Sequence, residues 1–167
     1  MLRITTEPTT EPITLTEAKD WLGIQGTAHD TKLTAAIKAA RKKVEQLAGK
    51  SIAAKSYTLE LDEYSQEYLD LSYPQVNQIT TVKTKDSEGT ETTIAATEYK
   101  LVYNRLYYQG SGYGLQVVYT TSANTEEFYK LAVKKQLAYD YRNSFSDNGF
   151  DQEVKQMIST DTVNLGF

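Results

Sequence analysis

The spacing of apolar residues changes twice along this 167-residue chain, and this change constrains the fold more than any other feature. Before about residue 55 apolar side chains recur at steps of three and four, which is typical of helices. From Ser56 they alternate with polar side chains, as in half-buried strands, and helical spacing returns after Ser122. We therefore predict an α+β fold. Its three main helices form a helical core, and an antiparallel β meander over residues 56–120 is inserted between the second and third helix.

The first predicted helix spans residues 14–22 and has well-defined ends. Thr14 is in the N-cap position and Glu17 is the third helical residue, so the two side chains can form a capping box. Gly23 follows the last helical residue, where glycine commonly ends a helix.

The second predicted helix spans residues 31–48, with Asp30 as its N-cap and Gly49 as its end. One of its faces is apolar, and the residues on that face are Leu33, Ile37, Ala40, Val44 and Leu47. Basic side chains lie off this face and are expected in solvent; they are Lys38, Arg41, Lys42 and Lys43.

The third predicted helix spans residues 125–143 and is apolar on two sides. Phe128 and Leu131 lie on one side, whereas Val133 and Leu137 lie on the other. A helix that is apolar on two sides has two neighbours. The second neighbour is either another element of the same chain or an adjacent subunit.

Both ends of the chain lie outside this pattern. Residues 1–13 hold two of the three prolines and few apolar side chains, so we expect an extended arm that orders on binding neighbours. We expect residues 1–143 to form one domain, with a β subdomain at about 56–120. Residues 144–167 then form a C-terminal tail.

The tail is rich in apolar side chains, and we predict that it docks onto a partner protein. The alternative is that it folds back onto its own domain. The candidate interface residues are Phe150, Val154, Met157, Ile158, Val163, Leu165 and Phe167.

Composition excludes several classes of protein. A net charge of −4 and a pI near 5.1 argue against nonspecific binding of nucleic acid, which requires concentrated Lys and Arg. The chain has no cysteine, so a disulfide framework and thiolate chemistry are excluded. No apolar run approaches the roughly 20 residues that span a bilayer, and no signal peptide is evident, so we expect a soluble protein with no membrane contact.

The sequence offers little that could support catalysis. His29 is the only histidine, and the carboxylates of Glu60 and Asp62 fall on the solvent face of a predicted strand. The glycine-rich segment 110–114 leads into a strand, so it lacks the helix N-terminus of a phosphate loop and is expected to be a hairpin turn. We therefore expect no catalytic residue, no cofactor and no metal site, and no enzymatic activity.

Tyrosine is unusually frequent, with 13 residues, most of them in the predicted β region. Tyrosine favours strands and interfaces, because its ring is large and rigid and its tip is polar. We interpret these residues as sheet packing combined with protein contact. A tyrosine-rich binding module for sugar or peptide is the alternative function.

Three segments in this order resemble the head-tail connector (adaptor) family of tailed bacteriophages and gene transfer agents. The first is the helix entry at 12–22, and the second is the helix at 30–49 with the following Lys50-Ser51-Ile52. The third is the segment 69–99, with Leu69-Asp70-Leu71, Pro74, the turn at 86–89 and Tyr99.

The resemblance implies a structural virion protein rather than an enzyme. Members of that family form a ring, commonly of twelve subunits, that joins the portal of the capsid to the tail or to a stopper or tail-completion protein. DNA passes through the ring without specific binding. The implied location is the virion neck, after assembly in the host cytoplasm.

Overall fold

A computed structural model describes residues 1–73, 75–144 and 149–163 of the chain. The chain divides into two compact units, each made from two stretches of sequence. The β unit combines Met1–Thr9 with Ala54–Ala123, and the helical unit combines Thr10–Ala53 with Asn124–Phe167. The class is α+β, as the sequence predicts.

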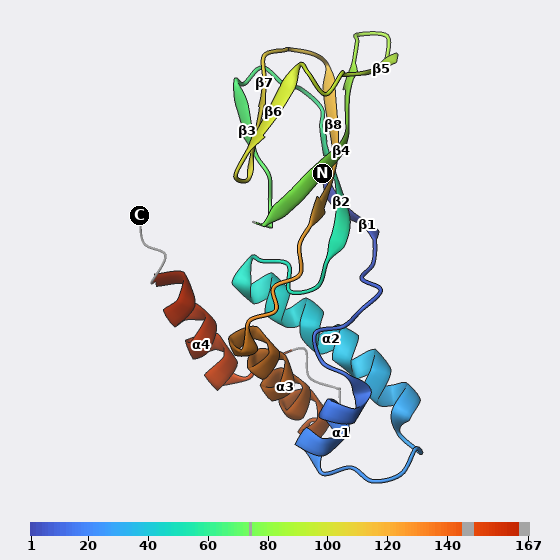
Figure 1. The fold of residues 1–167 in the computed structure, drawn as a ribbon, viewed down its shortest axis with the longest axis vertical. Coiled ribbons are helices and arrows are strands. Elements are labelled where there is room, and N and C mark those ends of the chain that lie inside the picture. Colours follow the sequence, from blue (N-terminus) through green and yellow to red (C-terminus); the bar gives the residue numbers. More distant parts are fainter. Residues whose placement is uncertain (74, 145–148, 164–167) are drawn as a thin grey trace. The chain divides into compact units, whose positions relative to one another are not determined.

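The described part of the helical unit holds four helices (Figure 1). They are α1 (Leu15–Leu22), α2 (Asp30–Ala48), α3 (Glu127–Arg142) and α4 (Gln152–Val163). The first three agree with the predicted helices. The fourth lies within the segment that we expected to be a tail.

The predicted ends of α1 are confirmed. Thr14 and Glu17 form the capping box, with the Glu17 N–H donating to Thr14 Oγ1 at 3.2 Å and the Thr14 N–H donating to Glu17 Oε2 at 2.7 Å. These bonds hold the pKa of Glu17 below its ordinary value. Gly23 ends the helix with a φ of 67°, in the left-handed region that glycine tolerates best.

The predicted N-cap of α2 is wrong. His29 is the N-cap residue and its side chain forms no cap hydrogen bond, whereas Asp30 is the first helical residue. The Asp30 carboxylate instead accepts a hydrogen bond from Lys19 Nζ at 2.8 Å. An ion pair with α1 has therefore replaced the cap that the local sequence suggested.

The core of the helical unit covers most, but not all, of the apolar surface of α3. α3 packs against α1, α2 and α4 of the same chain. Val133 and Leu137 are fully buried in a core to which α2 and α4 also contribute. On the other side, Phe128 packs at the edge of this core and Leu131 is 36% exposed, so a subunit contact on that side stays a prediction.

The described part of the β unit holds eight strands in two antiparallel sheets. The first sheet has the order β1-β2-β8-β4-β5, and its strands are β1 (Leu2–Thr6), β2 (Lys55–Leu61), β8 (Gly114–Thr121), β4 (Val76–Lys85) and β5 (Glu91–Thr93). The second sheet has the order β3-β7-β6, with β3 (Tyr68–Asp70), β7 (Arg105–Tyr108) and β6 (Tyr99–Val102).

The predicted meander is wrong in its topology. β2 pairs with β8 along seven residues, from Lys55 opposite Thr121 to Leu61 opposite Leu115, rather than with the strand that follows it. Residues 109–113 connect the two sheets and do not form the expected hairpin turn. Alternating polarity identifies strands one at a time but does not reveal which distant strand is the partner.

The N-terminal arm is not free. Residues Leu2–Thr6 pair with β2 as an edge strand, with Leu2 opposite Leu59 and Ile4 opposite Tyr57. The arm is ordered by the β unit itself, contrary to the expectation that it orders on binding neighbours. Few of its side chains are apolar, and the main-chain hydrogen bonds of the pairing compensate for this.

Tyrosine rings fill much of the core between the two sheets. Tyr57 stacks on Tyr73 and on Tyr119, with ring centroids 5.0 and 5.4 Å apart. The Tyr119 hydroxyl donates to the Ser72 carbonyl at 2.9 Å, and burial raises the pKa of Tyr119. The predicted role of tyrosine in sheet packing is confirmed for these residues.

Candidate interaction surfaces

A buried charge cluster fixes the N-terminal segment of the helical unit. The side chain of Arg41 is fully buried and donates to Glu11 Oε2 and to Glu45 Oε2, each at 2.7 Å. Burial alone would lower the pKa of Arg41, but the hydrogen bonds and charges of Glu11 and Glu45 raise it. The expectation that Arg41 lies on a solvated face is wrong, because the two carboxylates offset its desolvation.

The same cluster also holds the segment that follows α2. Glu45 Oε1 accepts the main-chain N–H of Ile52 at 2.8 Å and of Ala53 at 3.2 Å. The N–H of Asn124 donates to the Ile52 carbonyl at 3.0 Å. Three separate stretches of the helical unit therefore meet at one charged cluster.

Two polar networks attach α4 to the helical unit. Gln136 Oε1 accepts the Asp151 N–H at 3.1 Å, and the Asp151 carboxylate caps α4 by accepting the N–H groups of Glu153 and Val154. At the other end of α4, Asp161 accepts hydrogen bonds from Tyr129 Oη at 2.6 Å and from Lys50 Nζ at 2.9 Å.

The second network shifts the pKa of each member. The hydrogen bonds from Tyr129 and Lys50 lower the pKa of Asp161. Burial, together with the bond to Asp161, raises the pKa of Tyr129. Burial alone would lower the pKa of Lys50, but its bonds to Tyr129 and Asp161 raise it. Each shift favours the form in which the group makes these hydrogen bonds, namely ionised Asp161, protonated Lys50 and protonated Tyr129.

The structure distributes the predicted interface residues over several environments. Val154 and Ile158 are buried in the helical core, with exposures of 0% and 2%, so their side chains are not on the surface. Met157 packs at the edge of that core, and Phe150 is half-buried with Lys155 Nζ 6.0 Å from its ring centre. The side chain of Val163 and the residues Leu165 and Phe167 lie outside the described part of the chain.

The helical unit has an exposed tryptophan beside a hollow. Trp21 is 46% exposed and, with Leu22, Ala138, Tyr141 and Arg142, lines a hollow of about 420 Å³. A smaller adjoining hollow of about 110 Å³ shares three of these residues and adds Lys135, Asp151 and Glu153. We call the two hollows together the Trp21 groove. A large, partly exposed aromatic ring beside an arginine is typical of the residues that dominate protein interfaces.

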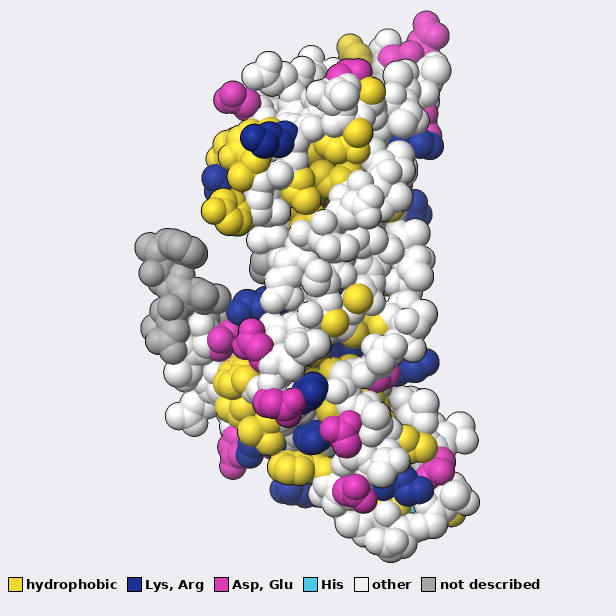
Figure 2. Space-filling view, viewed as in Figure 1, with side chains coloured by type: hydrophobic (Ala, Val, Ile, Leu, Met, Phe, Trp, Pro, Cys, Tyr) yellow, Lys and Arg dark blue, Asp and Glu magenta, His cyan; other side chains and the backbone are white. Residues whose placement is uncertain are grey.

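The β unit carries an exposed aromatic face on its second sheet. Tyr68 and Tyr107 lie opposite each other on β3 and β7, with ring centroids 5.9 Å apart. The guanidinium of Arg105 lies 4.8 Å from the Tyr68 ring centre and donates to Asp70 at 2.6 Å. Figure 2 shows hydrophobic side chains gathered with basic ones over this sheet.

The turn between β6 and β7 presents a further tyrosine. Tyr103 is 91% exposed and has a φ of 55°, a conformation that a bulky residue rarely adopts. The next residue, Asn104, fixes the turn: its side-chain oxygen accepts the N–H groups of Gln75 and Val76, and its carbonyl accepts that of Leu71.

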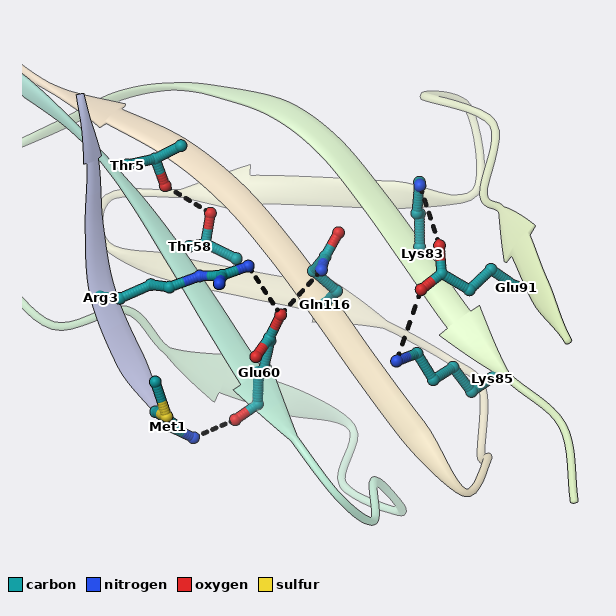
Figure 3. Close-up of polar contacts among 9 residues, drawn as sticks. All are labelled: Met1, Arg3, Thr5, Thr58, Glu60, Lys83, Lys85, Glu91 and Gln116. Carbon is teal, nitrogen blue, oxygen red and sulfur yellow. Dashed lines mark hydrogen bonds and ion pairs between the residues drawn. The ribbon is translucent and has the colours of Figure 1, made fainter. Parts of the chain in front are cut away.

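The outer face of the five-stranded sheet is polar (Figure 3). On β1, β2 and β8, Glu60 Oε1 accepts hydrogen bonds from Arg3 at 3.1 Å and from Gln116 at 2.9 Å. On β4 and β5, Lys83 and Lys85 both lie within ion-pair distance of Glu91, whose pKa they lower. Each of these cations therefore has a carboxylate beside it.

Metal-binding and membrane-spanning features were sought in the described part of the chain. Within residues 1–73, 75–144 and 149–163, no group of three His, Cys, Asp or Glu side chains is placed to hold a metal ion. His29 is exposed at the start of α2. No helix in this part of the chain is long and apolar enough to cross a membrane.

Sequence reasoning missed the Trp21 groove and the Tyr103 turn. Trp21 falls in a correctly predicted helix, but the hollow beside it depends on how α1 packs on α3. Tyr103 follows an alternating segment, and its neighbour Asn104 was the available signal, because asparagine is frequent in two-residue turns.

Two of three comparisons relate this chain to known proteins. Residues 11–163 match the model of the head completion protein family. A search of curated proteins found no match. The fold is similar to that of a protein in the neck of an empty GTA particle computed with C6 symmetry, with a TM-score of 0.78 and 20% identity over 96% of this chain and 94% of the other.

Two further solved structures have the same fold. One is from the virion of a native gene transfer agent (GTA) particle, with a TM-score of 0.75 and 20% identity over 96% of this chain and 94% of the other. The other is from the neck of a native GTA particle computed with C12 symmetry, with a TM-score of 0.75 and 21% identity over 96% and 93%. Because the family model covers nearly the whole chain, the protein belongs to the head completion protein family.

Proposed function

We propose that this protein is a structural component of a virion neck, where it forms a ring that connects the portal of the capsid to the tail. The observation that carries the proposal is the family match over residues 11–163. The fold likeness to neck proteins of GTA particles, computed with sixfold and twelvefold symmetry, supports it. The partners in this proposal are the portal protein, a tail or stopper protein, and further copies of the same chain.

The surfaces of the chain suit this role. Exposed tyrosines beside arginines occur on the second sheet, and an exposed tryptophan lies beside an arginine in the Trp21 groove. Large rigid rings and guanidinium groups contribute most to protein interfaces. A ring requires two different patches on each subunit, because the contact between neighbours is heterologous.

The proposed passage of DNA without specific binding agrees with the charge pattern. The net charge is −4, and the cations on the polar sheet face lie beside Glu60 or Glu91. Paired cations release fewer counterions from DNA, and they would retain it weakly.

A tyrosine-rich binding module remains the second candidate. Tyr68 and Tyr107 form an exposed pair of rings on which a sugar or a peptide could pack. Titration with oligosaccharides and peptides, followed by tyrosine fluorescence, tests this alternative. A ring-forming neck protein should show no saturable response.

We also propose that the end of the chain docks onto a partner, with Leu165 and Phe167 as its contact residues. Deleting residues 148–167 would remove the core residues Val154 and Ile158 and would unfold the helical unit. Deleting only residues 164–167 leaves α4 in place and is the better test. We expect this variant to remain folded and to fail to join portal-bearing heads, whereas normal attachment would contradict the docking role.

Deletion of the gene tests the proposal as a whole. We expect particles without the protein to accumulate as DNA-filled or leaking heads and separate tails. Complementation with the wild-type gene should restore tailed particles. Normal tailed particles from the deletion strain would contradict the proposal.

A further inference from the structure

We infer that the Tyr103 turn of one subunit inserts into the Trp21 groove of the next copy of this chain. This inference rests on the proposed ring and names the contact that would build it. A protruding aromatic side chain and a recessed aromatic hollow lie on the same chain, in different units. Such a pair of unlike patches is what a heterologous ring contact needs.

Tyr103 is highly exposed and has an unfavourable backbone conformation. Its ring is 91% exposed, more than that of any other large hydrophobic residue described. Its φ of 55° falls where glycine or asparagine is ordinarily found, so the residue is conformationally strained. Because an exposed and strained Tyr103 adds nothing to the core of its own chain, we interpret it as a residue that contacts another molecule.

Hydrogen bonds fix the backbone of the Tyr103 turn. Three hydrogen bonds of 2.8 to 3.1 Å join Asn104 to Leu71, Gln75 and Val76. The flanking strands β6 and β7 pair directly up to Val102 and Arg105. The backbone at Tyr103 is therefore ordered before binding, which reduces the entropy that the turn loses when it docks.

The Trp21 groove has the size and the lining to accept a tyrosine side chain. Its larger hollow, about 420 Å³, is wide enough for one phenol ring, and Trp21, Leu22, Ala138 and Tyr141 supply apolar walls. Arg142 lines both hollows and can lie over the ring of an inserted tyrosine.

The charges around the two patches do not oppose the contact. Lys100 lies near the turn on β6, on the face that carries Tyr107. The smaller hollow of the Trp21 groove is lined by Asp151 and Glu153 beside Lys135 and Arg142. Glu153 pairs with Lys135 and the Asp151 carboxylate caps α4, so these charges of the groove are already compensated, as Arg105 of the turn is by Asp70.

The first experiment is crosslinking in particles. Because the chain has no native cysteine, a thiol reagent reacts only with the introduced cysteines of this protein. The variant Lys100→Cys/Lys135→Cys carries one thiol beside the turn and one beside the groove, and it leaves Tyr103 and Trp21 intact. A short bis-maleimide should convert it into a ladder of covalent multimers. The control Lys100→Cys/Lys38→Cys places the second thiol on the exposed side of α2 and should remain monomeric.

The second experiment separates the contact from stability. Tyr103→Asn removes the ring but places a residue that tolerates positive φ in the turn. We expect its melting temperature to be unchanged or higher, while the yield of tailed particles falls at least tenfold. Tyr113→Asn is the matched control, because Tyr113 is 66% exposed on the same unit and should leave the yield unchanged.

Three results would overturn the inference. The first is that particles with the Lys100→Cys/Lys135→Cys variant give no covalent multimers. The second is that the crosslink forms only within one chain. The third is a normal yield of tailed particles from Tyr103→Asn. Blotting of wild-type particles distinguishes these results from failure of the proposed function. If the wild-type protein is absent from particles, the proposed ring is wrong, and so is the contact inferred within it.

Discussion

At the scale of single residues, this chain buries a charged side chain that its sequence pattern assigns to solvent. Arg41 lies in a run of basic residues that reads as a solvated helix face, yet its side chain is fully buried between Glu11 and Glu45. The partners are 30 residues before it and four residues after it. Only the second partner is visible as a helical spacing, so the cluster could not be predicted from the sequence.

Removing one carboxylate of this cluster should strongly destabilise the protein. We expect Glu45→Ala to lower the free energy of unfolding by about 3–5 kcal/mol, since it leaves the buried Arg41 with less compensation and frees the N–H groups of Ile52 and Ala53. Urea denaturation measures the change. Gln46→Ala, at the adjacent exposed position, should change it by less than about 0.5 kcal/mol, and equal effects would contradict the assignment.

The pair of Asp161 with Lys50 and Tyr129 should make stability depend on pH. The pKa of Asp161 is lower in the folded protein than its ordinary value of 3.8, so its ionised form stabilises the fold above that value. This contribution is lost as the pH falls through the folded pKa.

We therefore expect Asp161→Asn to lower the free energy of unfolding by up to about 1 kcal/mol near neutral pH, and by progressively less below about pH 4. Urea denaturation at several pH values measures the difference. Asp20→Asn, at an exposed position on α1, serves as the control. A difference from wild type that stays constant down to low pH would contradict the pairing.

At the scale of elements, the local signals were sufficient for most helices and strands. The capping box at Thr14, the stop at Gly23 and the alternation over 57–61 all depend on neighbouring residues, and the structure confirms them. β1 was missed because its stability comes from pairing with β2, more than 50 residues later. The pairing of β2 with β8 was missed for the same reason.

The status of α4 is the main correction at this scale. Its apolar residues suggested a tail that docks onto a partner, but Val154 and Ile158 pack in the core of the helical unit. A core helix and a docking helix have the same amphipathic pattern, so the sequence could not distinguish them. The docking role of the residues after α4 stays a prediction, as does the division into a domain at 1–143 and a tail at 144–167.

Substitution at Ile158 tests whether α4 belongs to the core. We expect Ile158→Ala to lower the free energy of unfolding by about 2–5 kcal/mol and Ile158→Val by about 0.5–1.5 kcal/mol, in proportion to the cavity left. Thermal or urea unfolding gives both values. Gln156→Ala, on the exposed side of α4, should have little effect, and a neutral Ile158→Ala would show that α4 is not part of the core.

At the scale of the whole molecule, membership in the head completion protein family agrees with what the sequence alone suggested. The resemblance rested on the order of short segments across the chain, and that order carries fold information even where no motif is diagnostic. The surfaces that would build a ring were not predictable. The Trp21 groove depends on the packing of α1 against α3, and the Tyr103 turn depends on Asn104 reaching the start of β4.

Our claim that many copies of this chain form a ring in the virion neck can be checked by cryo-electron microscopy of purified particles. We expect neck density into which both units fit, repeated around a closed cycle, with unlike patches of adjacent subunits in contact. Quantitative mass spectrometry of the same particles should give a full ring of copies for each particle. One or two copies per particle, or neck density into which neither unit fits, would contradict the claim.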